Sequence, residues 1–167
     1  MATDFSKPEN NPFTYIRDKH EKHAAFVIHR NKNANVVVYA LRLKEEGAIV
    51  EEDALNVYWV MFEKAGHPKE NLNMIERNTG YGATCTKREG TEGEYEIVVT
   101  SIKDTRIILK LEDGKAVARG TFNGVDDCTL ERVFVSSKSV MGLPKVQYVE
   151  FFGTAPDGSP FTERKTA

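Results

Sequence analysis

The chain of 167 residues has two cysteines and no long apolar run, and both shortages limit its class. Cys85 and Cys128 stand far apart with no CxxC pair, so the sequence predicts neither a disulfide scaffold nor a zinc site. No apolar run approaches the roughly 20 residues that cross a bilayer. The polar N-terminus also lacks the apolar core of a signal peptide. We therefore expect a cytoplasmic protein with free thiols and no membrane span.

Neither sign of charge is in large excess. The net charge is −2 and the basic residues are scattered along the chain, so we do not expect a nucleic-acid partner. A chain of this length buries one core, which predicts a single domain over residues 24–167. Residues 1–23 are polar and proline-containing, and we expect a flexible N-terminal arm there. Phe13, Tyr15 and Ile16 are apolar enough to anchor its end.

Alternating apolar residues separated by turn residues dominate the rest of the chain. The run 57–62 is apolar on both faces around the single tryptophan, Trp59, as in a strand that is covered on two sides. The pairs Asp113-Gly114 and Asn123-Gly124 are typical of tight hairpin turns. The sequence predicts about nine short strands in an antiparallel β-sandwich or flattened barrel.

One short helix is predicted over residues 68–78. Pro68 suits a first helical position, because its missing N–H would have no partner inside the helix. Leu72 and Ile75 form a narrow apolar stripe that we expect to pack on the sheet. Gly80 favours a left-handed end to the helix.

Several motifs occur in order along the chain: VIHRNKNANVVVY, NVYWV, ENLNMIERNTGYG, ERVFV and PKVQYVEFFGTAPDGSPFTER. This order resembles the DUF4833 family over roughly residues 26–165. The chain departs from the family pattern at Glu76, where the family has glutamine, and at Thr79-Gly80, where it has an apolar-alanine pair. The resemblance implies a shared fold, and it implies no particular reaction. The matching positions are Arg30, Trp59, Ile75, Arg77, Tyr81, Gly82, Arg132, Phe134, Val135, Tyr148, Val149, Glu150, Gly153, Glu163 and Arg164.

Three arginines are candidates for binding an anion, because a guanidinium recognises carboxylate or phosphate through two parallel hydrogen bonds. If they converge with two tyrosines, they form an anion pocket under the short helix. The alternative is that each arginine pairs with a nearby glutamate (Glu76, Glu131, Glu150 or Glu163) and fixes the strand register. The candidate ligand-binding residues are Arg30, Arg77, Tyr81, Arg132, Tyr148 and Glu150.

Metal sites and catalytic groups are weakly indicated. His20 and His23 lack a third ligand nearby in sequence, and the acidic loop 44–53 lacks the regular spacing of a calcium loop. Nothing in the sequence places a histidine beside either cysteine, as a thiol nucleophile requires. We predict no metal, no cofactor and no catalytic residue.

The aromatic residues either fill the core or line a cavity for an apolar ligand. Phe151 and Phe152 are consecutive, so one of them faces away from the core and is a candidate partner contact. The leading hypothesis is a non-catalytic binding module for a protein partner or an anionic small molecule. The alternative is a hydrolase-like enzyme with its site beneath the 68–78 helix. The oligomeric state is left open.

Overall fold

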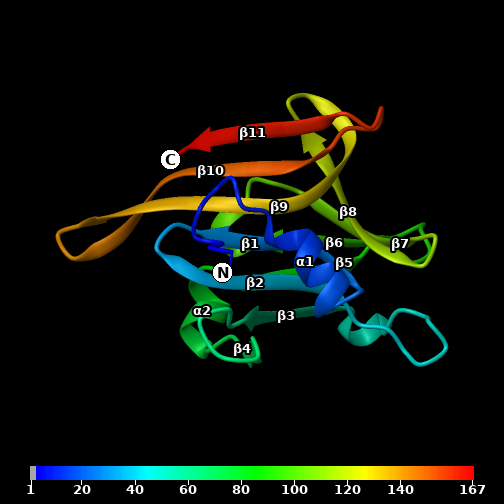
Figure 1. The fold of residues 1–167 in the computed structure, drawn as a ribbon. Coiled ribbons are helices and arrows are strands. Elements are labelled where there is room, and N and C mark those ends of the chain that lie inside the picture. The colour runs from blue at the N-terminus through cyan, green and yellow to red at the C-terminus, as the bar shows by residue number, and fades with distance from the viewer. Residues whose placement is uncertain (1–2) are drawn as a thin grey trace.

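A single curled sheet carries most of the chain (Figure 1). The computed structural model describes residues 3–167, apart from the side chains at positions 78 and 79. Along the main path the strands follow the order β4-β3-β2-β1-β9-β8-β7-β6-β5, and β10 and β11 continue from the other edge of β9. In sequence order the elements are α1 (Pro12–Lys19), β1 (Ala24–Arg30), β2 (Asn33–Leu41), η1 (Glu51–Asp53), β3 (Leu55–Val60), β4 (Lys69–Asn71), α2 (Met74–Thr79), β5 (Ala83–Lys87), β6 (Tyr95–Val99), η2 (Thr100–Ile102), β7 (Ile107–Glu112), β8 (Lys115–Phe122), β9 (Val125–Val140), β10 (Leu143–Thr154) and β11 (Pro160–Thr166).

The predicted β-rich fold is confirmed, but the predicted purely antiparallel arrangement is wrong. Strand β1 pairs in parallel with β9, with Val27 opposite Arg132. This pairing is possible because β9 has 16 residues. Along one edge its first part pairs with β8 and its middle part pairs with β1, while its other edge pairs with β10. The sheet has eleven strands in the described residues and curls into a half-barrel instead of forming the two facing layers of a sandwich.

The two predicted hairpin turns are confirmed. Asp113-Gly114 joins β7 to β8 with φ angles of 53° and 76°, and Asn123-Gly124 joins β8 to β9 with φ angles of 52° and 75°. Both residues of each pair therefore adopt the left-handed conformation that matches the twist of the flanking strands.

The inside of the half-barrel holds the main core. Phe26 and Tyr39 stack with ring centroids 4.5 Å apart, and both are fully buried. The alternating pattern of β6 and β7 points Ile97 and Leu109 into the same core. The prediction that the strand around Trp59 is covered on both faces is confirmed, since Trp59 belongs to this core and Tyr58 to a second cluster outside the sheet.

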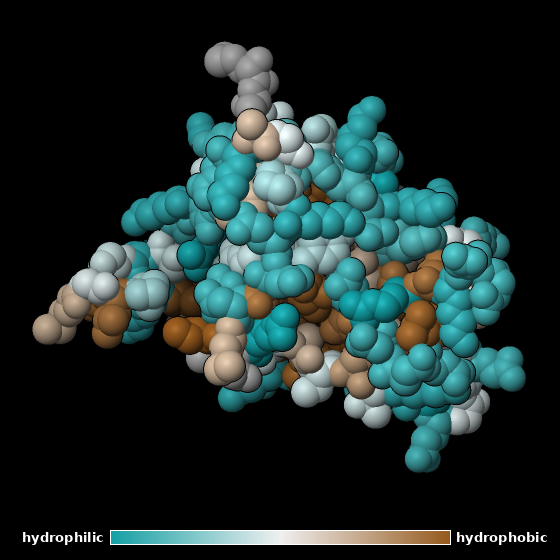
Figure 2. Space-filling view, turned by 90° about the horizontal axis from the view of Figure 1, so that it is seen from below, coloured by the Kyte–Doolittle hydropathy of each residue, from teal (hydrophilic) through white to brown (hydrophobic). Residues whose placement is uncertain are grey.

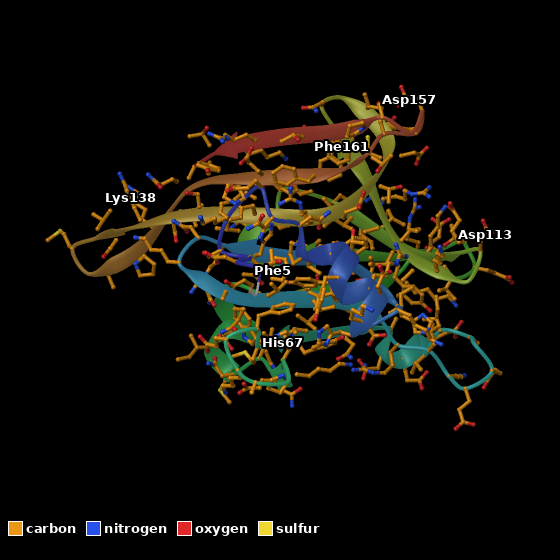
Figure 3. All side chains as sticks on the ribbon, viewed as in Figure 1. Phe5, His67, Asp113, Lys138, Asp157 and Phe161 are labelled. Carbon is orange, nitrogen blue, oxygen red and sulfur yellow. The ribbon has the colours of Figure 1, made fainter. Side chains whose placement is uncertain are left out.

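That second cluster forms where the N-terminal segment covers the outer face of β1, β2 and β3. The segment 1–23, predicted as a flexible arm, contains helix α1, which begins at Pro12 after Asn11 accepts a hydrogen bond from the Phe13 backbone N–H. Phe13 and Ile16 are buried against the sheet, as predicted, while Tyr15 is 40% exposed. Phe5 is buried in the same cluster (Figure 3).

The predicted start of the short helix is wrong. Residues Lys69–Asn71 form strand β4, which pairs with Tyr58–Val60 of β3, so the chain is extended where a helix was expected. Helix α2 begins only at Met74, because Asn73 caps it and Glu76 completes a reciprocal capping box with Asn73.

Two further details of this helix differ from the expectation. The helix ends at Thr79, yet Gly80 has a φ of −131°, so the predicted left-handed end is wrong. Leu72 is buried as expected, but Met74 and Ile75 are 78% and 73% exposed. The late start of the helix changes its orientation, and its apolar stripe therefore faces outward.

Candidate functional site

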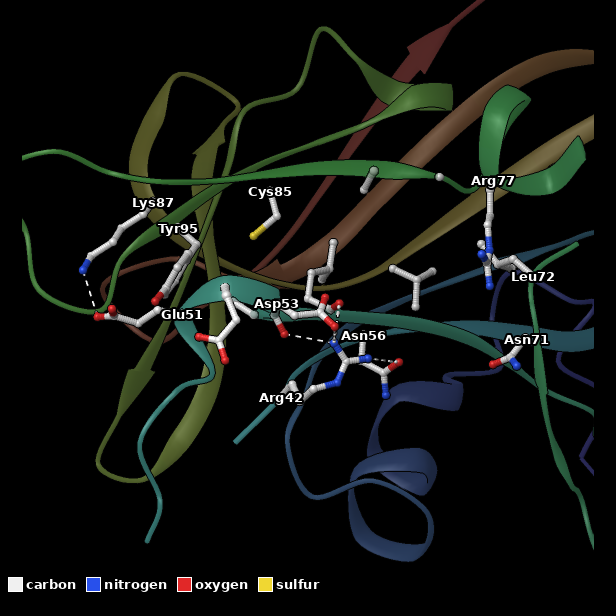
Figure 4. Close-up of a pocket in the computed structure, with 16 residues that line it drawn as sticks. Arg42, Glu51, Asp53, Asn56, Asn71, Leu72, Arg77, Cys85, Lys87 and Tyr95 are labelled. Atoms are coloured by element: carbon white, nitrogen blue, oxygen red, sulfur yellow. Dashed lines mark hydrogen bonds and ion pairs between the residues drawn. The ribbon is translucent and has the colours of Figure 1, made fainter. Parts of the chain in front are cut away.

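The two ends of the curled sheet face each other along a seam between β3 and β5, and a pocket of about 530 Å³ lies in this seam (Figure 4). Beyond Tyr58–Val60, strand β3 has no strand partner on the side away from β2. Within residues 3–167, strand β5 pairs with β6 and with no other strand. We call this cavity the seam pocket. It is lined by Arg42, Glu51, Glu52, Asp53, Ala54, Leu55, Asn56, Val57, Asn71, Leu72, Arg77, Gly82, Ala83, Cys85, Lys87 and Tyr95.

One end of the seam is closed by Tyr81, which follows α2. The Tyr39 hydroxyl donates a 2.7 Å hydrogen bond to the Tyr81 carbonyl oxygen. The Tyr81 ring meets the Trp59 ring edge to face, with centroids 5.0 Å apart. The Trp59 indole N–H donates to Glu76 Oε1 over 3.2 Å, which ties the base of α2 to β3. These contacts hold α2 over this end of the seam pocket.

The other end of the seam is closed by charge pairs. Lys87 of β5 forms a 2.9 Å ion pair with Glu51 of η1, across the seam. Arg42 pairs with Asp53, and its Nη2 donates to Asn56 Oδ1 over 3.1 Å. Two of the three cations that line the pocket are therefore already neutralised by carboxylates.

Several polar side chains of the seam pocket have no hydrogen bond or ion pair among the described residues, namely those of Glu52, Asn71, Arg77 and Tyr95. Arg77 projects from α2 toward the pocket, and its guanidinium has no hydrogen bond or ion pair there (Figure 4). Tyr95 is only 2% exposed, and its hydroxyl has no hydrogen-bond partner. Tyr95 lies opposite Lys87 at one end of β5, whereas Arg77 lies beside Gly82 before the other end. Four residues of extended strand separate these ends, about 13 Å.

Cys85 also lines the seam pocket, between the two ends of β5. Cys85 is exposed at the surface, but partial desolvation in the pocket, and to a smaller extent the charge of Asp53, raise the pKa of its thiol above the ordinary value. At neutral pH the sulfur is therefore protonated and a weak nucleophile. No histidine is among the described residues that line the pocket.

The six predicted ligand-binding residues do not form one cluster. Arg30 lies over the Tyr81 ring at 6.0 Å, on the core side of α2, and Arg77 lies in the seam pocket. Tyr148 and Glu150 lie on β10, where both contact Arg164 of β11. The Arg164 guanidinium is 3.8 Å from the Tyr148 ring centroid and 3.3 Å from Glu150 Oε1. The structure brings Arg30 together with Tyr81 and Tyr148 together with Glu150, and the charge of Glu150 also acts on Arg132.

Arg132, the last of the six, joins the N-terminal segment to the sheet. Its Nη1 donates to the Pro8 carbonyl oxygen over 2.6 Å and to His29 Nε2 over 3.0 Å, and its guanidinium stacks on the Phe152 ring at 3.7 Å. His29 Nδ1 in turn lies 2.8 Å from the Phe5 carbonyl oxygen. Phe152 faces away from the core, as expected for one of the two consecutive phenylalanines, but an arginine covers it.

Some residues of the seam pocket were missed by the sequence analysis. Arg42 and Tyr95 lie outside the quoted motifs, and Asn56 begins the NVYWV motif but was not named as a site residue. A usable signal was the composition of β5, Ala-Thr-Cys-Thr-Lys, which has no large apolar side chain. A strand of that composition cannot close an apolar core on its inner face.

Residues 26–164 match the model of a domain of unknown function, DUF4833. The chain belongs to this family. No curated protein and no solved structure matches it.

The DUF4833 motif glycines lie where the backbone leaves no room for a side chain. A Cβ on Gly82 would stand 1.6 Å from the Arg77 carbonyl oxygen, and a Cβ on Gly153 would stand 1.9 Å from the Thr129 carbonyl oxygen. The first close approach fixes α2 against β5 above the seam pocket. The second lies at the irregular pairing of β10 with β9. Together with the Trp59–Tyr81 contact, Gly82 shows that one DUF4833 motif builds an end of the seam.

Metal-ligating side chains are scattered in the described part of this DUF4833 chain. Within it, no three histidine, cysteine or carboxylate side chains are grouped to hold a metal ion. His20 lies 6.0 Å from His67 between ring centroids, beside the Phe62 ring. None of the helices in residues 3–167 is long and apolar enough to cross a membrane.

Proposed function

We propose that this DUF4833 protein is a non-catalytic binding module that takes an extended, acidic peptide segment in the seam pocket. The observation that carries the proposal is the unpaired Arg77 guanidinium, which faces a pocket whose other cations already have carboxylate partners. A carboxylate on the ligand would give Arg77 the two-pronged hydrogen bonding that a guanidinium favours.

An extended ligand suits the seam, because strand edges without a strand partner lie on both sides of it. Among the described residues, the outer edge of β5 is unpaired, and so is β3 over 55–57 on the side of the seam, although the Leu55 carbonyl oxygen already accepts from Arg42 over 3.5 Å. A peptide strand added at such an edge gains main-chain hydrogen bonds, and its alternate side chains enter the pocket. The Tyr95 hydroxyl, which has no partner among the described residues, supplies a further hydrogen-bonding group at the other end of β5, one strand length of about 13 Å along the seam.

The chemistry of the lining supports binding over the alternative of a hydrolase-like site. The Cys85 thiol has a raised pKa and no histidine beside it in the described lining. Glu51 and Asp53 already form ion pairs with Lys87 and Arg42. None of these groups is arranged as a nucleophile with an adjacent general base.

A peptide titration followed by NMR tests this function. The probes are blocked peptides of about six valine and threonine residues that end in glutamate, glutamine or lysine. We expect the glutamate peptide to shift the backbone amide signals of β5 and of residues 55–57, and to bind about tenfold more tightly than the lysine peptide. Arg77→Gln should remove this preference.

The matched control is Arg106→Gln, which changes an exposed arginine outside the seam pocket and should leave binding unchanged. If no peptide shifts the amides of β5, or if Arg77→Gln binds all three peptides like the unaltered protein, the seam is not the binding site. Turnover of the peptide by the unaltered protein but not by Cys85→Ser would instead establish the enzymatic alternative.

A further inference from the structure

The end of β9 and the start of β10 leave the sheet as a two-stranded ribbon (Figure 1). Pairing of β1 with β9 stops at Val135, and pairing of β11 with β10 starts at Tyr148. The Asn31 side chain supports the base of the ribbon through two hydrogen bonds to the Ser137 backbone. Its Nδ2 donates to the Ser137 carbonyl oxygen over 2.8 Å, and its Oδ1 accepts from the Ser137 N–H over 3.0 Å. Beyond this point the two strands pair only with each other, so the tip of the ribbon extends away from the core.

Apolar side chains gather at this tip without burial. Met141 is 97% exposed, Leu143 is 70% exposed, and Val140 and Val146 are each 40% exposed. Brown atoms mark this apolar end of the projection in Figure 2. Met141 also has a φ of 50°, a left-handed conformation in which asparagine or glycine is the usual residue. Apolar residues occupy a turn where polar ones would fold more easily.

The charge around the tip has one sign. Residues 136–147 include Lys138 and Lys145 and no acidic residue, although the whole chain has a net charge of −2. Lys138 stands on the ribbon in Figure 3, and neither it, Lys145 nor Lys32 has an ion-pair partner in the described residues. A hollow of about 220 Å³ at the base of the ribbon contains three cations and no carboxylate. It is lined by Arg30, Asn31, Lys32, Ser137, Lys138, Ser139, Gly142 and Pro144.

We propose that the ribbon tip docks the protein on an anionic lipid bilayer. Met141 and Leu143 enter the boundary between headgroups and acyl chains, while Lys138, Lys145 and Lys32 contact headgroup phosphates. Only the turn enters, because the outer edges of the ribbon carry unpaired backbone groups that hydrocarbon cannot satisfy. The tip has aliphatic side chains and no aromatic ring, whereas protein interfaces concentrate their energy in tryptophan, tyrosine and arginine.

Sedimentation with lipid vesicles tests this proposal. The probes are vesicles of phosphatidylcholine alone and of phosphatidylcholine with about one-third phosphatidylserine. We expect binding to the anionic vesicles only, weakened by added salt. Met141→Asn keeps the left-handed turn and Leu143→Thr keeps strand propensity, and each should weaken binding about tenfold. Lys138→Gln and Lys145→Gln should each weaken it about fivefold.

The matched controls lie outside the tip. Val125→Thr changes another exposed apolar residue, and Lys103→Gln another exposed lysine, and neither should change vesicle binding. The proposal is wrong if the protein ignores anionic vesicles, binds both vesicle types equally, or binds as well with Met141→Asn. It is also wrong if light scattering shows a dimer that Met141→Asn converts to a monomer, because a second copy then covers the tip.

Discussion

His29 should make the folding stability depend on pH. It is 1% exposed, and burial lowers its pKa from the usual 6.5 to about 4. The hydrogen bond to the Phe5 carbonyl opposes this lowering of the pKa, whereas the charge of Arg132 adds to it. The partners fix the neutral tautomer. A carbonyl oxygen only accepts and a guanidinium only donates, so Nδ1 carries the hydrogen toward Phe5 and Nε2 accepts from Arg132. Protonation would place a second donor against Arg132.

The sign and size of the effect follow from proton linkage. The folded pKa of His29 lies below the unfolded value, so the unfolded chain binds the proton more readily. The contribution is therefore fully present above about pH 6.5 and is lost as the pH falls toward 4, about 3 kcal/mol in total. At about pH 5, where most carboxylates are still ionised, we expect a loss of about 2 kcal/mol.

Urea unfolding from about pH 7.5 to about pH 5 measures this loss. His29→Gln is the comparison, because its amide can donate to Phe5 and accept from Arg132 without titrating in this range. Burial also lowers the pKa of His20, with smaller contributions from His67 and Lys69, and this effect cancels when the two proteins are subtracted. Equal pH dependence in the two proteins would refute the reasoning.

Two further predictions concern the closed end of the seam, and urea unfolding checks both. Gly82→Ala should destabilise the protein by about 1–3 kcal/mol or more, because the new Cβ meets the Arg77 carbonyl. Gly80→Ala is the control, because a Cβ there has nothing within 4 Å, and it should change stability by less than about 0.5 kcal/mol. Equal effects of the two substitutions would contradict the close approach at Gly82. Glu76→Gln should be nearly neutral, since an amide oxygen can still accept from the Trp59 indole N–H. Glu76→Ala should lower the stability by about 1–2 kcal/mol, because it removes the acceptor for Trp59 and for the Asn73 backbone. Equal losses in the two variants would contradict a role for Glu76 as hydrogen-bond acceptor.

The strands were predictable because their signals are local. Strand β1 begins with five consecutive apolar residues, Ala24 to Ile28, and Asp113-Gly114 favours a hairpin by the φ angles it tolerates. The parallel pairing of β1 with β9 was not predictable, because it joins Val27 to Arg132 across more than a hundred residues. The sequence of either strand alone does not indicate which strand it pairs with.

The N-terminal segment and α2 show how tertiary contacts override local patterns. Phe5 and Ile16 are sparse apolar residues in a polar segment, and only the apolar outer face of the sheet makes them buried. Pro68 favoured a helix, yet Lys69–Asn71 gains backbone hydrogen bonds by pairing with β3. The capping box at Asn73 was present in the sequence, and it marked the true start of α2.

One residue of the candidate site, Arg77, could be predicted from the sequence, whereas the geometry of the site could not. Arg77 was named from the sequence as an anion-binding group, and among the described residues it is the cation of the seam pocket that has no carboxylate partner. Arg132 was named by the same argument, but it binds the backbone of the N-terminal segment and His29. Residue type alone does not separate these two arginines, because the difference lies in whether the chain itself supplies an acceptor.

The open seam itself follows from the composition of β5. The inner faces of β6 and β7 carry large apolar side chains, so they continue the core of the half-barrel. The side chains of β5 that line the seam pocket are Ala83, Cys85 and Lys87, which are too small or too polar to pack against β3. The sheet therefore curls without closing, and charge pairs and the Tyr81 contacts bridge only its ends. An added strand in the gap would complete the barrel by supplying the backbone partners that β5 and β3 lack, which is the physical basis of the proposed peptide binding.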